Sequence, residues 1–551
     1  MTTNAKQILF IDNDPHLVRS VPRWLRLAGY EVVVARSSAE AEYALVHELF
    51  QLAIIDIRID DDHSDTDTSG FVLARRLPAS VPCIFHTAHD TKENIHEALG
   101  RIGADDIIAK DDPAAPQKLL ARVDELFHTG VKVNFDLAIE NSPDLSEVAG
   151  PLPVAADAPP PTAQDVMLIL RRLFQEAEAV QLTPLVTRET ITKSARSSAL
   201  LFIVQERRPQ GTPVPVVLKL GDAATIAAEA EAYHRIKAFL GGQRRTQLEG
   251  EAYSRAVGGL VYSLIGAAGT NQVQPLADLL VSQPAATVAP LLERFFQTTF
   301  GQIHADAQPA TLDLMAHYTA ELRLTAAKLQ CTAQALDPAL LTSPTLPWPE
   351  LPRPLPNPLF QVLEGDAIRS FGSLLTQTTL CHGDLHSHNV LVDEEQHFWL
   401  IDFARATQSH SLRDFAELET DIKFRALPPQ LLADFLAFES ALVAPTVWEE
   451  EPTAILLPTP LQQAFDLVTA LRRIARQQLA QAGANTAYQQ ALFWHTLNVM
   501  RLKTIEPERK RQALASAALI LERHFKPPPP NLPLVRGGTV PPLTRGRLGG
   551  G

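Results

Sequence analysis

Residues 7–127 alternate five short apolar runs with amphipathic stretches, and this alternation constrains the fold more strongly than any other feature of the chain. The runs read QILFID, YEVVVA, LAIIDI, VPCIFHT and DDIIAK. Strands that alternate with helices form an open parallel sheet with helices on both faces. The sequence therefore predicts an α/β unit at residues 5–128, built on a doubly wound sheet of five parallel strands.

Polar side chains follow four of these runs, at the points where strands are expected to end. They are Asp12, Asp56, Thr87 and Lys110. Because the carboxyl ends of parallel strands share one edge of a sheet, we expect these side chains to meet there. Carboxylates hold Mg²⁺ through oxygen ligands, and one carboxylate can act as a nucleophile toward a phosphoryl group. Thr87 and Lys110 can then bind the phosphate oxygens. Taken singly, each Asp also fits the simpler interpretation of a helix cap.

Taken together, these residues resemble the receiver domain of two-component response regulators. The resemblance implies a flavodoxin-like fold in which Asp56 accepts phosphate from a sensor histidine kinase. It also implies that Thr87 and Lys110 act as the switch residues that read the phosphorylated state. Asp12, Asn13 and Asp56 would bind Mg²⁺. Asn13 stands where the family carries a second acid, so one ligand would be a neutral amide oxygen.

A second unit begins near residue 166 with a helical pattern and continues with the strand-like runs ALLFIVQERR and VPVVLKLG. The helical stretch IAAEAEAYHRIKAFL and the run GGLVYSLIGA follow. Beyond them the pattern is mostly helical, apart from one predicted hairpin, NVLVDEEQHFWLIDF. The sequence predicts a bilobal α+β domain at residues 166–440, with a small sheet-rich lobe, a larger helical lobe and a helical extension at 441–525.

The segment LCHGDLHSHNVLV, followed by FWLIDFARA, carries the strongest functional pattern in the chain. Phosphoryl transfer from ATP needs a carboxylate that orients the attacking hydroxyl, ligands for Mg²⁺ and a lysine that grips the nucleotide phosphates. Asp384 and Asn389 lie on one predicted loop, and the hairpin returns Asp402 beside Asn389. Two oxygen ligands that are distant in sequence can therefore face one ion.

This segment resembles the H-G-D-x-x-x-x-N loop of the kinase-like fold, specifically that of the aminoglycoside and choline phosphotransferase branch. The resemblance covers residues 166–440. It implies that Asp384 is the catalytic base, that Asn389 and Asp402 bind Mg²⁺, and that His382 positions the loop. Lys219, at the end of the strand VPVVLK, matches the lysine that grips the ATP phosphates.

The same resemblance implies an ion-pair partner for Lys219 and a phosphate-binding loop. The partner is Glu229 on the next helix, with Glu231 as the alternative. The loop falls at KSARSSAL, residues 193–200, which contains no glycine. Ser197 and Ser198 are small enough to let backbone amides approach a nucleotide phosphate, but the flexibility of glycine is lost. ATP binding is therefore better supported than turnover.

Two further segments, GGLVYSLIG and RDFAELE, are similar to a bacterial signalling-associated branch called the ternary complex associated domain. Proline-rich stretches divide the rest of the chain. We expect an extended linker at residues 129–165, an insertion at 338–358 within the kinase-like domain, and a disordered tail at 526–551.

The amino-acid composition limits the classes of partner and the cellular environment that we expect for this chain. A net charge of -14 argues against binding to nucleic acid, which requires clustered Lys and Arg. No stretch approaches the roughly 20 apolar residues that span a bilayer, so we expect no membrane segment. The three cysteines lack the spacing of a disulfide framework or a thiolate zinc site, which fits a reducing cytoplasm.

Two functional hypotheses follow. In the first, phosphorylation of Asp56 controls an ATP- and Mg²⁺-dependent phosphotransferase that acts on an unknown small-molecule or protein acceptor. In the second, the protein is a phosphorylation-responsive adaptor, and its pseudokinase domain binds nucleotide but catalyses little. A transcription factor is disfavoured, because no basic helix-turn-helix follows the receiver-like unit.

Overall fold

The computed structural model places most of the 551 residues of the chain. The described residues are 6–61, 63–64, 66–78, 80–184, 199–209, 215–237, 246–264, 273–364, 373–428, 430–479, 483–502 and 505–525.

The first unit contains a parallel sheet of five strands in the order β2-β1-β3-β4-β5. The strands are β1 (Gln7–Ile11), β2 (Glu31–Ala35), β3 (Leu52–Ile55), β4 (Cys83–Thr87) and β5 (Asp106–Ala109). They coincide with the five apolar runs of the sequence. The order reverses next to β1, which is the topological switch of a doubly wound sheet. The prediction of a five-stranded parallel sheet is confirmed.

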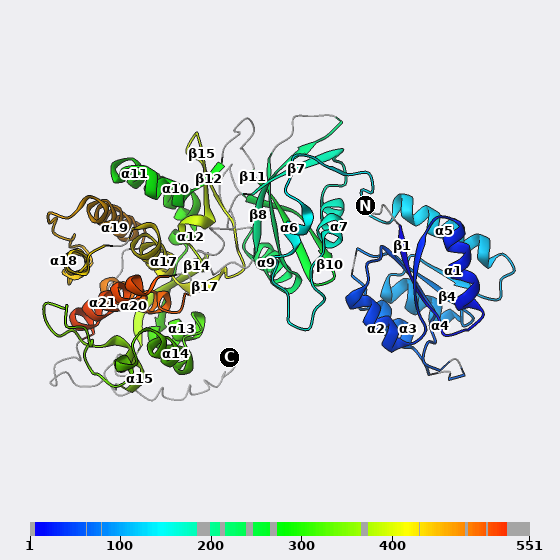
Figure 1. Cartoon of the computed structure of the whole chain (residues 1–551), viewed down its shortest axis with the longest axis horizontal. Coiled ribbons are helices and arrows are strands. Elements are labelled where there is room, and N and C mark those ends of the chain that lie inside the picture. Colours follow the sequence, from blue (N-terminus) through cyan, green and yellow to red (C-terminus); the bar gives the residue numbers. More distant parts are fainter. Residues whose placement is uncertain are drawn as a thin grey trace, which may run out of the picture.

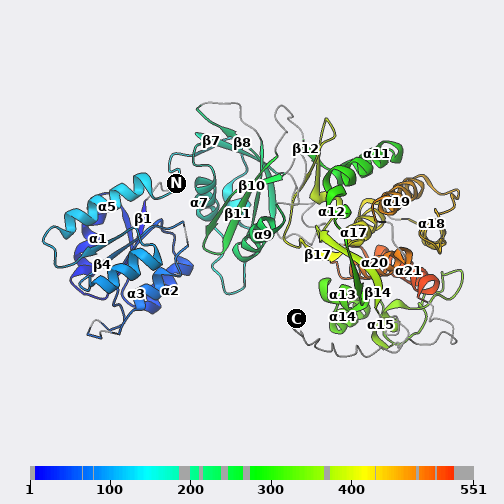
Figure 2. The ribbon, with the colours of Figure 1, turned by 180° about the vertical axis from the view of Figure 1, so that it is seen from behind.

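Helices cover both faces of this sheet (Figure 2). They are α1 (Leu17–Leu27), α2 (Ser38–His47), α3 (Ser69–Ala74), α4 (Lys92–Ile95), which continues as the π-helical turn η1 (His96–Ile102), and α5 (Ala115–Thr129). Successive residues of a strand point to opposite faces. Leu9 and Ile11 therefore join one apolar cluster, while Ile8 and Phe10 join the other.

A second sheet lies between the first unit and a large helical region (Figure 1). Its strand order is β10-β11-β9-β8-β7-β6. The strands are β6 (Ala138–Ile139), β7 (Ala179–Pro184), β8 (Leu200–Arg207), β9 (Val216–Asp222), β10 (Thr246–Ser254) and β11 (Val257–Leu264). Helices α6 (Leu145–Ala149), α7 (Ala163–Leu173) and α9 (Ala223–Ile236) accompany it. We call residues 134–264 the sheet lobe.

The segment expected to be an extended linker, residues 129–165, differs from that expectation over much of its length. Strand β6 pairs with β7 in parallel, and Leu137, Leu145 and Leu152 are buried in the same apolar cluster as strands of the sheet lobe. The proline content suggested an extended chain, but the apolar residues between the prolines pack onto the lobe. A capping box between Thr162 and Asp165 then starts α7.

The helical lobe, residues 273–525, contains two small sheets and most of the helices. The sheets are β12 (Val273–Pro275) with β15 (Val390–Asp393) and β16 (Phe398–Leu400), and β13 (Gln308–Leu312) with β14 (Leu374–Cys381) and β17 (Thr407–His410). The first helices are α10 (Leu276–Ser282), α11 (Ala285–Phe295) with the π-helical turn η2 (Phe296–Phe300), α12 (Gly301–Ala305), α13 (Leu314–Glu321), α14 (Ala326–Leu336) and α15 (Pro358–Glu364). The later ones are α17 (Arg413–Asp421) with the π-helical turn η5 (Ile422–Ala426), α18 (Leu432–Val443), α19 (Thr459–Gln478), α20 (Ala484–Val499) and α21 (Pro507–His524).

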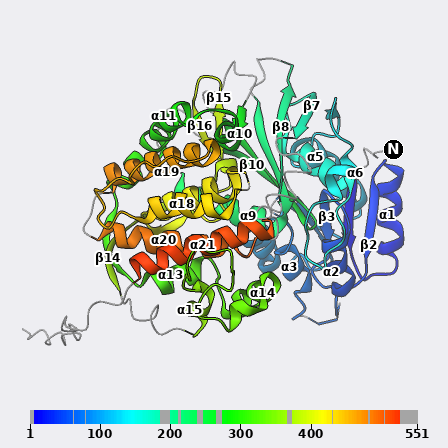
Figure 3. The ribbon, with the colours of Figure 1, turned by 60° about the vertical axis from the view of Figure 1, so that its left-hand side comes forward.

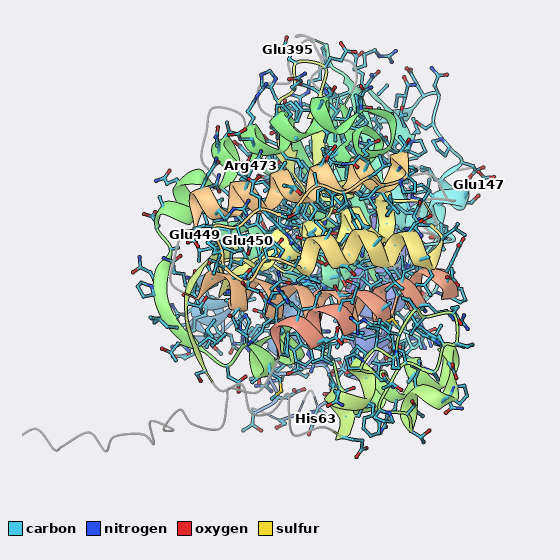
Figure 4. The ribbon with its side chains drawn as sticks, turned by 90° about the vertical axis from the view of Figure 1, so that its left-hand side faces the viewer. His63, Glu147, Glu395, Glu449, Glu450 and Arg473 are labelled. Atoms are coloured by element: carbon cyan, nitrogen blue, oxygen red, sulfur yellow. The ribbon has the colours of Figure 1, made fainter. Side chains whose placement is uncertain are left out.

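Helices α18 to α21 lie side by side on the outer face of this lobe (Figure 3). A buried network of ion pairs and one hydrogen bond joins α18, α19 and α20 to α17 and η5. Glu419 pairs with Arg472 at 2.7 Å and with Lys423 at 2.8 Å, and Lys423 also lies 2.9 Å from Glu439. Tyr488 donates a hydrogen bond to Glu419 at 2.6 Å. By contrast, Arg473 points outward from α19 (Figure 4).

The proline-rich segment 338–358 lies within the helical lobe, and four of its large apolar side chains, those of Leu340, Leu346, Trp348 and Leu355, are buried. It begins with the 3-10 turn η3 (Pro338–Leu341), and Leu346, Trp348 and Leu355 join the main apolar cluster. The fully buried Asn357 donates to the carbonyls of Leu340 and Ser343, both at 2.8 Å. This side chain closes the segment onto itself and places α15 against the lobe.

A side-chain hydrogen bond to a backbone carbonyl crosses between the two lobes near the hairpin β15–β16. Thr246, at the start of β10, donates its hydroxyl to the carbonyl of Leu400 at 2.6 Å. The expected tail at residues 526–551 lies outside the described residues. Within the described ranges, no helix is long and apolar enough to cross a membrane.

Candidate functional site

Lys110 lies between two buried carboxylates at the carboxyl edge of the first sheet. Its Nζ is 2.6 Å from Asp56 Oδ2 and 2.9 Å from Asp12 Oδ2. Asp12 follows β1, Asp56 follows β3, and Lys110 follows β5, so the parallel topology brings the three together. Each carboxylate residue is 1% exposed, whereas the Lys110 side chain is 12% exposed. The Lys110 side chain is therefore the part of this cluster that is most open to solvent.

Helix α3 begins directly against Asp56, and a glycine makes this possible. A Cβ at position 70 would lie 1.9 Å from the carbonyl oxygen of Asp56, which no side chain could tolerate. Gly70 also donates its backbone N–H to Ile57 at 3.0 Å. Asp56 is thereby fixed between the end of β3 and the start of α3.

The other two residues predicted for this edge are also in place. Thr87 ends β4 and is fully buried, and its hydroxyl oxygen accepts a hydrogen bond from His89 N at 3.2 Å. Asn13 is half-buried directly after Asp12. The backbone N–H of Asp14 donates to Asp12 Oδ1 at 2.9 Å, which orients the first carboxylate.

Burial and the neighbouring charges shift the pKa values of Asp12 and Lys110. Desolvation raises the pKa of Asp12 to about 6, although the Lys110 charge opposes this shift. Burial alone would lower the pKa of Lys110, but Asp56 and Asp12 outweigh it and raise that pKa. Asp12 Oδ2 is buried and accepts no hydrogen bond of good geometry. This oxygen pairs with the Lys110 ammonium at 2.9 Å, and two carboxylates that share such an edge fit a hard divalent cation.

A second lysine between two carboxylates lies where the two lobes meet. Lys219 Nζ is 2.6 Å from Glu229 Oε2 and 2.9 Å from Asp402 Oδ2. Lys219 comes from β9, Glu229 from α9, and Asp402 from the end of the hairpin β15–β16. Tyr262, on β11, donates to Glu229 Oε1 at 2.7 Å. Glu231, the alternative partner, pairs with Arg235 at the surface instead.

This second cluster is more deeply buried than the first. The side chains of Lys219 and Glu229 are 2% and 0% exposed. Burial alone would lower the pKa of Lys219, but the charges of Asp402 and Glu229 outweigh it and raise that pKa. The lysine is therefore held in its charged form. Ser197 and Ser198, predicted to approach a nucleotide phosphate, lie outside the described residues.

The loop from His382 to Asn389 is held by hydrogen bonds within the loop and by hydrogen bonds to Ile401, the residue before Asp402. Asn389 Nδ2 donates to the carbonyl of Asp384 at 2.9 Å. Asn389 is also joined to the residue before Asp402, because Ile401 N donates to its carbonyl at 3.1 Å. His382 Nε2 donates to the Ile401 carbonyl at 3.0 Å. These contacts bring Asp384, Asn389 and Asp402 into one neighbourhood, as the hairpin predicts.

Two positions in this loop region have backbones in the left-handed region. Gly383 has φ of 77°, and a Cβ there would lie 2.3 Å from the Arg405 carbonyl oxygen. Asp402 has φ of 67°, which is unusual for a residue with a side chain. Strained backbone of this kind is often found at functional sites, and here the residue also bonds Lys219.

The described residues contain no group of three or more His, Cys, Asp and Glu side chains that could hold a metal ion. Each candidate site instead offers two acidic or amide oxygens close to a lysine. Asp12 and Asp56 are the available oxygen donors of the first site, with the Asn13 amide nearby. Asn389 and Asp402 are those of the second. A cation at either site would need further ligands from water or from a bound phosphate group.

The N-terminal unit, which contains the first candidate site, matches a known family. Residues 8–124 match the family described as response regulator receiver domain. This part of the chain is a receiver domain. Similar curated proteins include the transcriptional regulatory protein GltR of Pseudomonas aeruginosa, 31% identical over 132 residues, which are 23% of this chain and 50% of that protein. The phosphate regulon transcriptional regulatory protein PhoB of the same organism is 32% identical over 124 residues, 22% of this chain and 50% of that protein.

The chain thus spans about half the length of these curated relatives. Among solved structures, a CheY-like response regulator receiver domain protein from Methanospirillum hungatei is 29% identical. That match covers 22% of this chain and 94% of the other, with a TM-score of 0.20.

A second match covers residues 332–501 and is described as ternary complex associated domain 9. The segment RDFAELE, at the start of α17, lies inside this range, whereas GGLVYSLIG lies outside it. The C-terminal part of the chain therefore contains a ternary complex associated domain. It includes Asp384, Asn389 and Asp402, but not Lys219.

Sequence reasoning missed the residues that hold the Asp384 loop. Asp414 accepts hydrogen bonds from His382 N at 2.7 Å and Gly383 N at 2.9 Å, and Asp421 accepts one from Ser387 N at 2.8 Å. Both acids lie on α17, about 30 residues after the loop. The unusual density of charged residues in RDFAELETD, which are buried along the whole helix, was the available signal.

Proposed function

We propose that this protein is a response regulator whose receiver domain controls an ATP- and Mg²⁺-dependent phosphotransferase. In this proposal Asp56 accepts a phosphoryl group from a sensor histidine kinase. Its carboxylate is held at the sheet edge by Lys110 and by the backbone around Gly70. The oxygens of Asp12 and Asp56 would hold Mg²⁺, which neutralises charge on the incoming phosphoryl group.

In this proposal, Lys110 and Thr87 respond to phosphorylation of Asp56. Lys110 contacts Asp56 directly, so new phosphate oxygens would compete for its ammonium. Thr87, at the end of the adjacent strand β4, would supply a hydroxyl donor to the new phosphate oxygens. A change in these two contacts would alter the β4 and β5 ends of the receiver domain, which is a route for the signal.

One observation carries the phosphotransferase proposal: Lys219 bridges Glu229 and Asp402 across the two lobes. A lysine fixed by a helix glutamate grips ATP phosphates, while an aspartate and an asparagine hold the metal ion. Asn389 and Asp402 would supply those oxygens. Asp384, whose loop Asn389 joins, would accept the proton of the attacking hydroxyl.

Phosphate transfer to the receiver domain is tested with a labelled phosphate donor such as acetyl phosphate. Wild-type protein should become labelled, and Asp56→Ala should not. Glu93→Ala removes an exposed carboxylate from α4 of the same domain and serves as the matched control, which should label normally. Equal labelling of wild type and Asp56→Ala would contradict the assignment of Asp56.

Nucleotide binding is tested through thermal stability, because a ligand that binds only the folded state raises the melting temperature. Mg·ATP should stabilise the wild-type full chain, and Asp402→Ala should lose that gain. Glu449→Ala, an exposed carboxylate on the outer face of the helical lobe, should keep it (Figure 4). If Mg·ATP leaves the melting temperature of the wild-type chain unchanged, the proposal that the chain binds nucleotide is wrong.

The alternative function is a receiver-controlled adaptor that binds nucleotide with little turnover. The absence of glycine from residues 193–200 favours this alternative, because flexible glycine normally lets the backbone close over phosphate. Measuring ATP consumption with and without acetyl phosphate separates the two. Consumption that depends on Asp384 supports the phosphotransferase, whereas nucleotide binding without consumption supports the adaptor.

A further inference from the structure

A cavity of about 690 Å³ opens on the side of the Asp384 loop within the helical lobe. Its walls come from three segments that are distant in sequence: the end of α13 and the start of α14, the chain around β17, and the end of α20. A volume of this size suits a small molecule rather than a protein chain. Nothing in the receiver domain contributes to it.

The wall of this cavity is strongly basic. Its charged residues are Arg323, Lys328, Arg405, Arg413 and Arg501, against the single carboxylate of Glu321. Five cations and one anion give a formal charge of +4, in a chain whose net charge is -14. Such a local reversal of sign raises the concentration of anions at the site.

Two of these cations contact backbone carbonyls. Arg501 donates to the carbonyl of Leu322 at 2.6 Å, and Lys328 donates to the carbonyl of Arg323 at 3.2 Å. Carbonyl oxygens orient a cation without neutralising it. Two others lie near carboxylates: Arg413 is 2.8 Å from Glu321, and Arg405 is 3.9 Å from Asp384.

The cavity adjoins the proposed catalytic base. Arg405 Nη1, in the cavity wall, lies 3.9 Å from Asp384 Oδ1. Arg413 Nη2 donates to the carbonyl of Gly383, the residue before Asp384, at 2.9 Å. A molecule held by the cavity cations would therefore have its far end within reach of the Asp384 loop.

We propose that this basic cavity binds the acceptor substrate, and that the acceptor is a small hydroxyl compound carrying an oxyanion group, either phosphate or carboxylate. This inference rests on the proposed phosphotransferase function and specifies its substrate class. The arginine side chains bind the oxyanion, since guanidinium groups match phosphate and carboxylate geometry. The hydroxyl end of the acceptor faces Asp384.

The transfer step then balances with ATP as the donor. The acceptor hydroxyl oxygen forms a bond to the γ-phosphorus of ATP, and the bond from that phosphorus to the β,γ-bridging oxygen breaks. ADP leaves with the electron pair of the broken bond. Asp384 takes the proton of the acceptor hydroxyl. The product carries one more phosphoryl group than the acceptor.

The charge of the cavity also excludes a class of acceptor. Cationic compounds, such as choline or an aminoglycoside, would meet five positive side chains and one carboxylate. Like charges placed together disfavour binding strongly. The acceptor of this chain therefore differs in charge from the substrates named by the phosphotransferase branch that its Asp384 loop resembles.

The test is direct binding by calorimetry on the full chain, with Mg·ATP present throughout to occupy the nucleotide site. Inorganic phosphate, acetate and choline are the probes. Phosphate or acetate should bind and choline should not, and whichever oxyanion binds more tightly identifies the anchoring group. Arg323→Gln should weaken oxyanion binding about tenfold, because it removes one charged hydrogen-bond donor. Arg294→Gln removes an exposed charge from α11 outside the cavity and should change nothing.

Several results would overturn the inference: failure of both oxyanions to bind, equal affinity in wild type and Arg323→Gln, or tighter binding of choline. None of these depends on turnover. The proposed function fails separately, if Mg·ATP does not stabilise the wild-type chain, and oxyanion binding measured without nucleotide would still report on the cavity.

Discussion

The two candidate sites share one arrangement of charged side chains but differ in the elements that surround it. Each places a lysine between two carboxylates, with distances of 2.6 Å and 2.9 Å in both cases. Around Lys110 all three residues follow strands of one sheet, so the fold of a single domain assembles the cluster. Around Lys219 they come from a strand, a helix and a hairpin of two lobes. The first cluster therefore depends on one sheet, and the second depends on how the lobes are arranged.

The largest expected effect comes from removing each lysine in turn. Lys219→Met leaves Glu229 and Asp402 buried and uncompensated, which should lower the free energy of unfolding by about 3–5 kcal/mol. Lys110→Met should cost less, about 1–3 kcal/mol, because the Lys110 side chain lies at a partly open edge. Scanning calorimetry of both variants measures the difference, with the exposed Lys237→Met as the control.

Equal losses in the two lysine variants would contradict the comparison. That outcome would mean that solvent reaches the Lys219 cluster as readily as the receiver edge, and that the lobes do not enclose it.

A second prediction concerns the buried ionic network around Glu419 and its contribution to the free energy of unfolding. Burial alone would raise the pKa of Glu419, but Arg472 and Lys423 outweigh it and lower that pKa to about 2 from an ordinary 4.5. A lowered carboxyl pKa stabilises the fold above the ordinary value, and this stability is lost as the pH falls through the folded value. Glu419 should thus contribute about 3 kcal/mol at neutral pH.

Glu419→Gln should therefore be less stable than wild type at pH 7, and the difference should shrink as the pH falls from about 4.5 toward 2. Denaturant unfolding at several pH values measures this trend. The exposed Glu449→Gln should follow wild type throughout (Figure 4). A gap between Glu419→Gln and wild type that stays constant with pH would contradict the ionic role of Glu419.

The smallest effect concerns the contact between the receiver domain and the sheet lobe. Arg255, in the turn between β10 and β11, pairs with Asp165 and also donates to the carbonyl of His47 at 3.2 Å, at the end of α2. Arg255→Lys keeps the charge beside Asp165 but cannot make both contacts at once. We expect at most about 1 kcal/mol of lost stability, since one hydrogen bond to a carbonyl is lost.

The informative measurement for Arg255→Lys is the midpoint of Mg·ATP stabilisation with and without acetyl phosphate. If this contact transmits the signal, the shift caused by acetyl phosphate should be smaller in the variant than in wild type. An unchanged shift would place the coupling route elsewhere.

The sequence predicted the receiver domain well because its information is local and periodic. Each apolar run forms one strand, and the residue that ends each run is placed by topology at the same edge. Asp12, Asp56, Thr87 and Lys110 therefore lie where the spacing predicts, and so does the neighbourhood of Asp384, Asn389 and Asp402. Their chemical roles stay predictions.

Other features could not be read in advance, because they depend on packing between distant segments. The linker prediction rested on proline content, whereas Leu137, Leu145 and Leu152 find a partner surface only in the folded sheet lobe. The basic cavity gathers Arg323, Arg405 and other cations from three segments that lie far apart in the sequence. Asp414 likewise acts on a loop about 30 residues away.

The hydrogen bond from Thr246 to the Leu400 carbonyl ties the sheet lobe to the hairpin that ends at Asp402. Leu400 ends β16, two residues before Asp402, and Thr246 begins β10. A hinge movement that separates the lobes must therefore either break this tether or pull the hairpin end along with it. While the tether holds, a change in the angle between the lobes would therefore also shift Asp402.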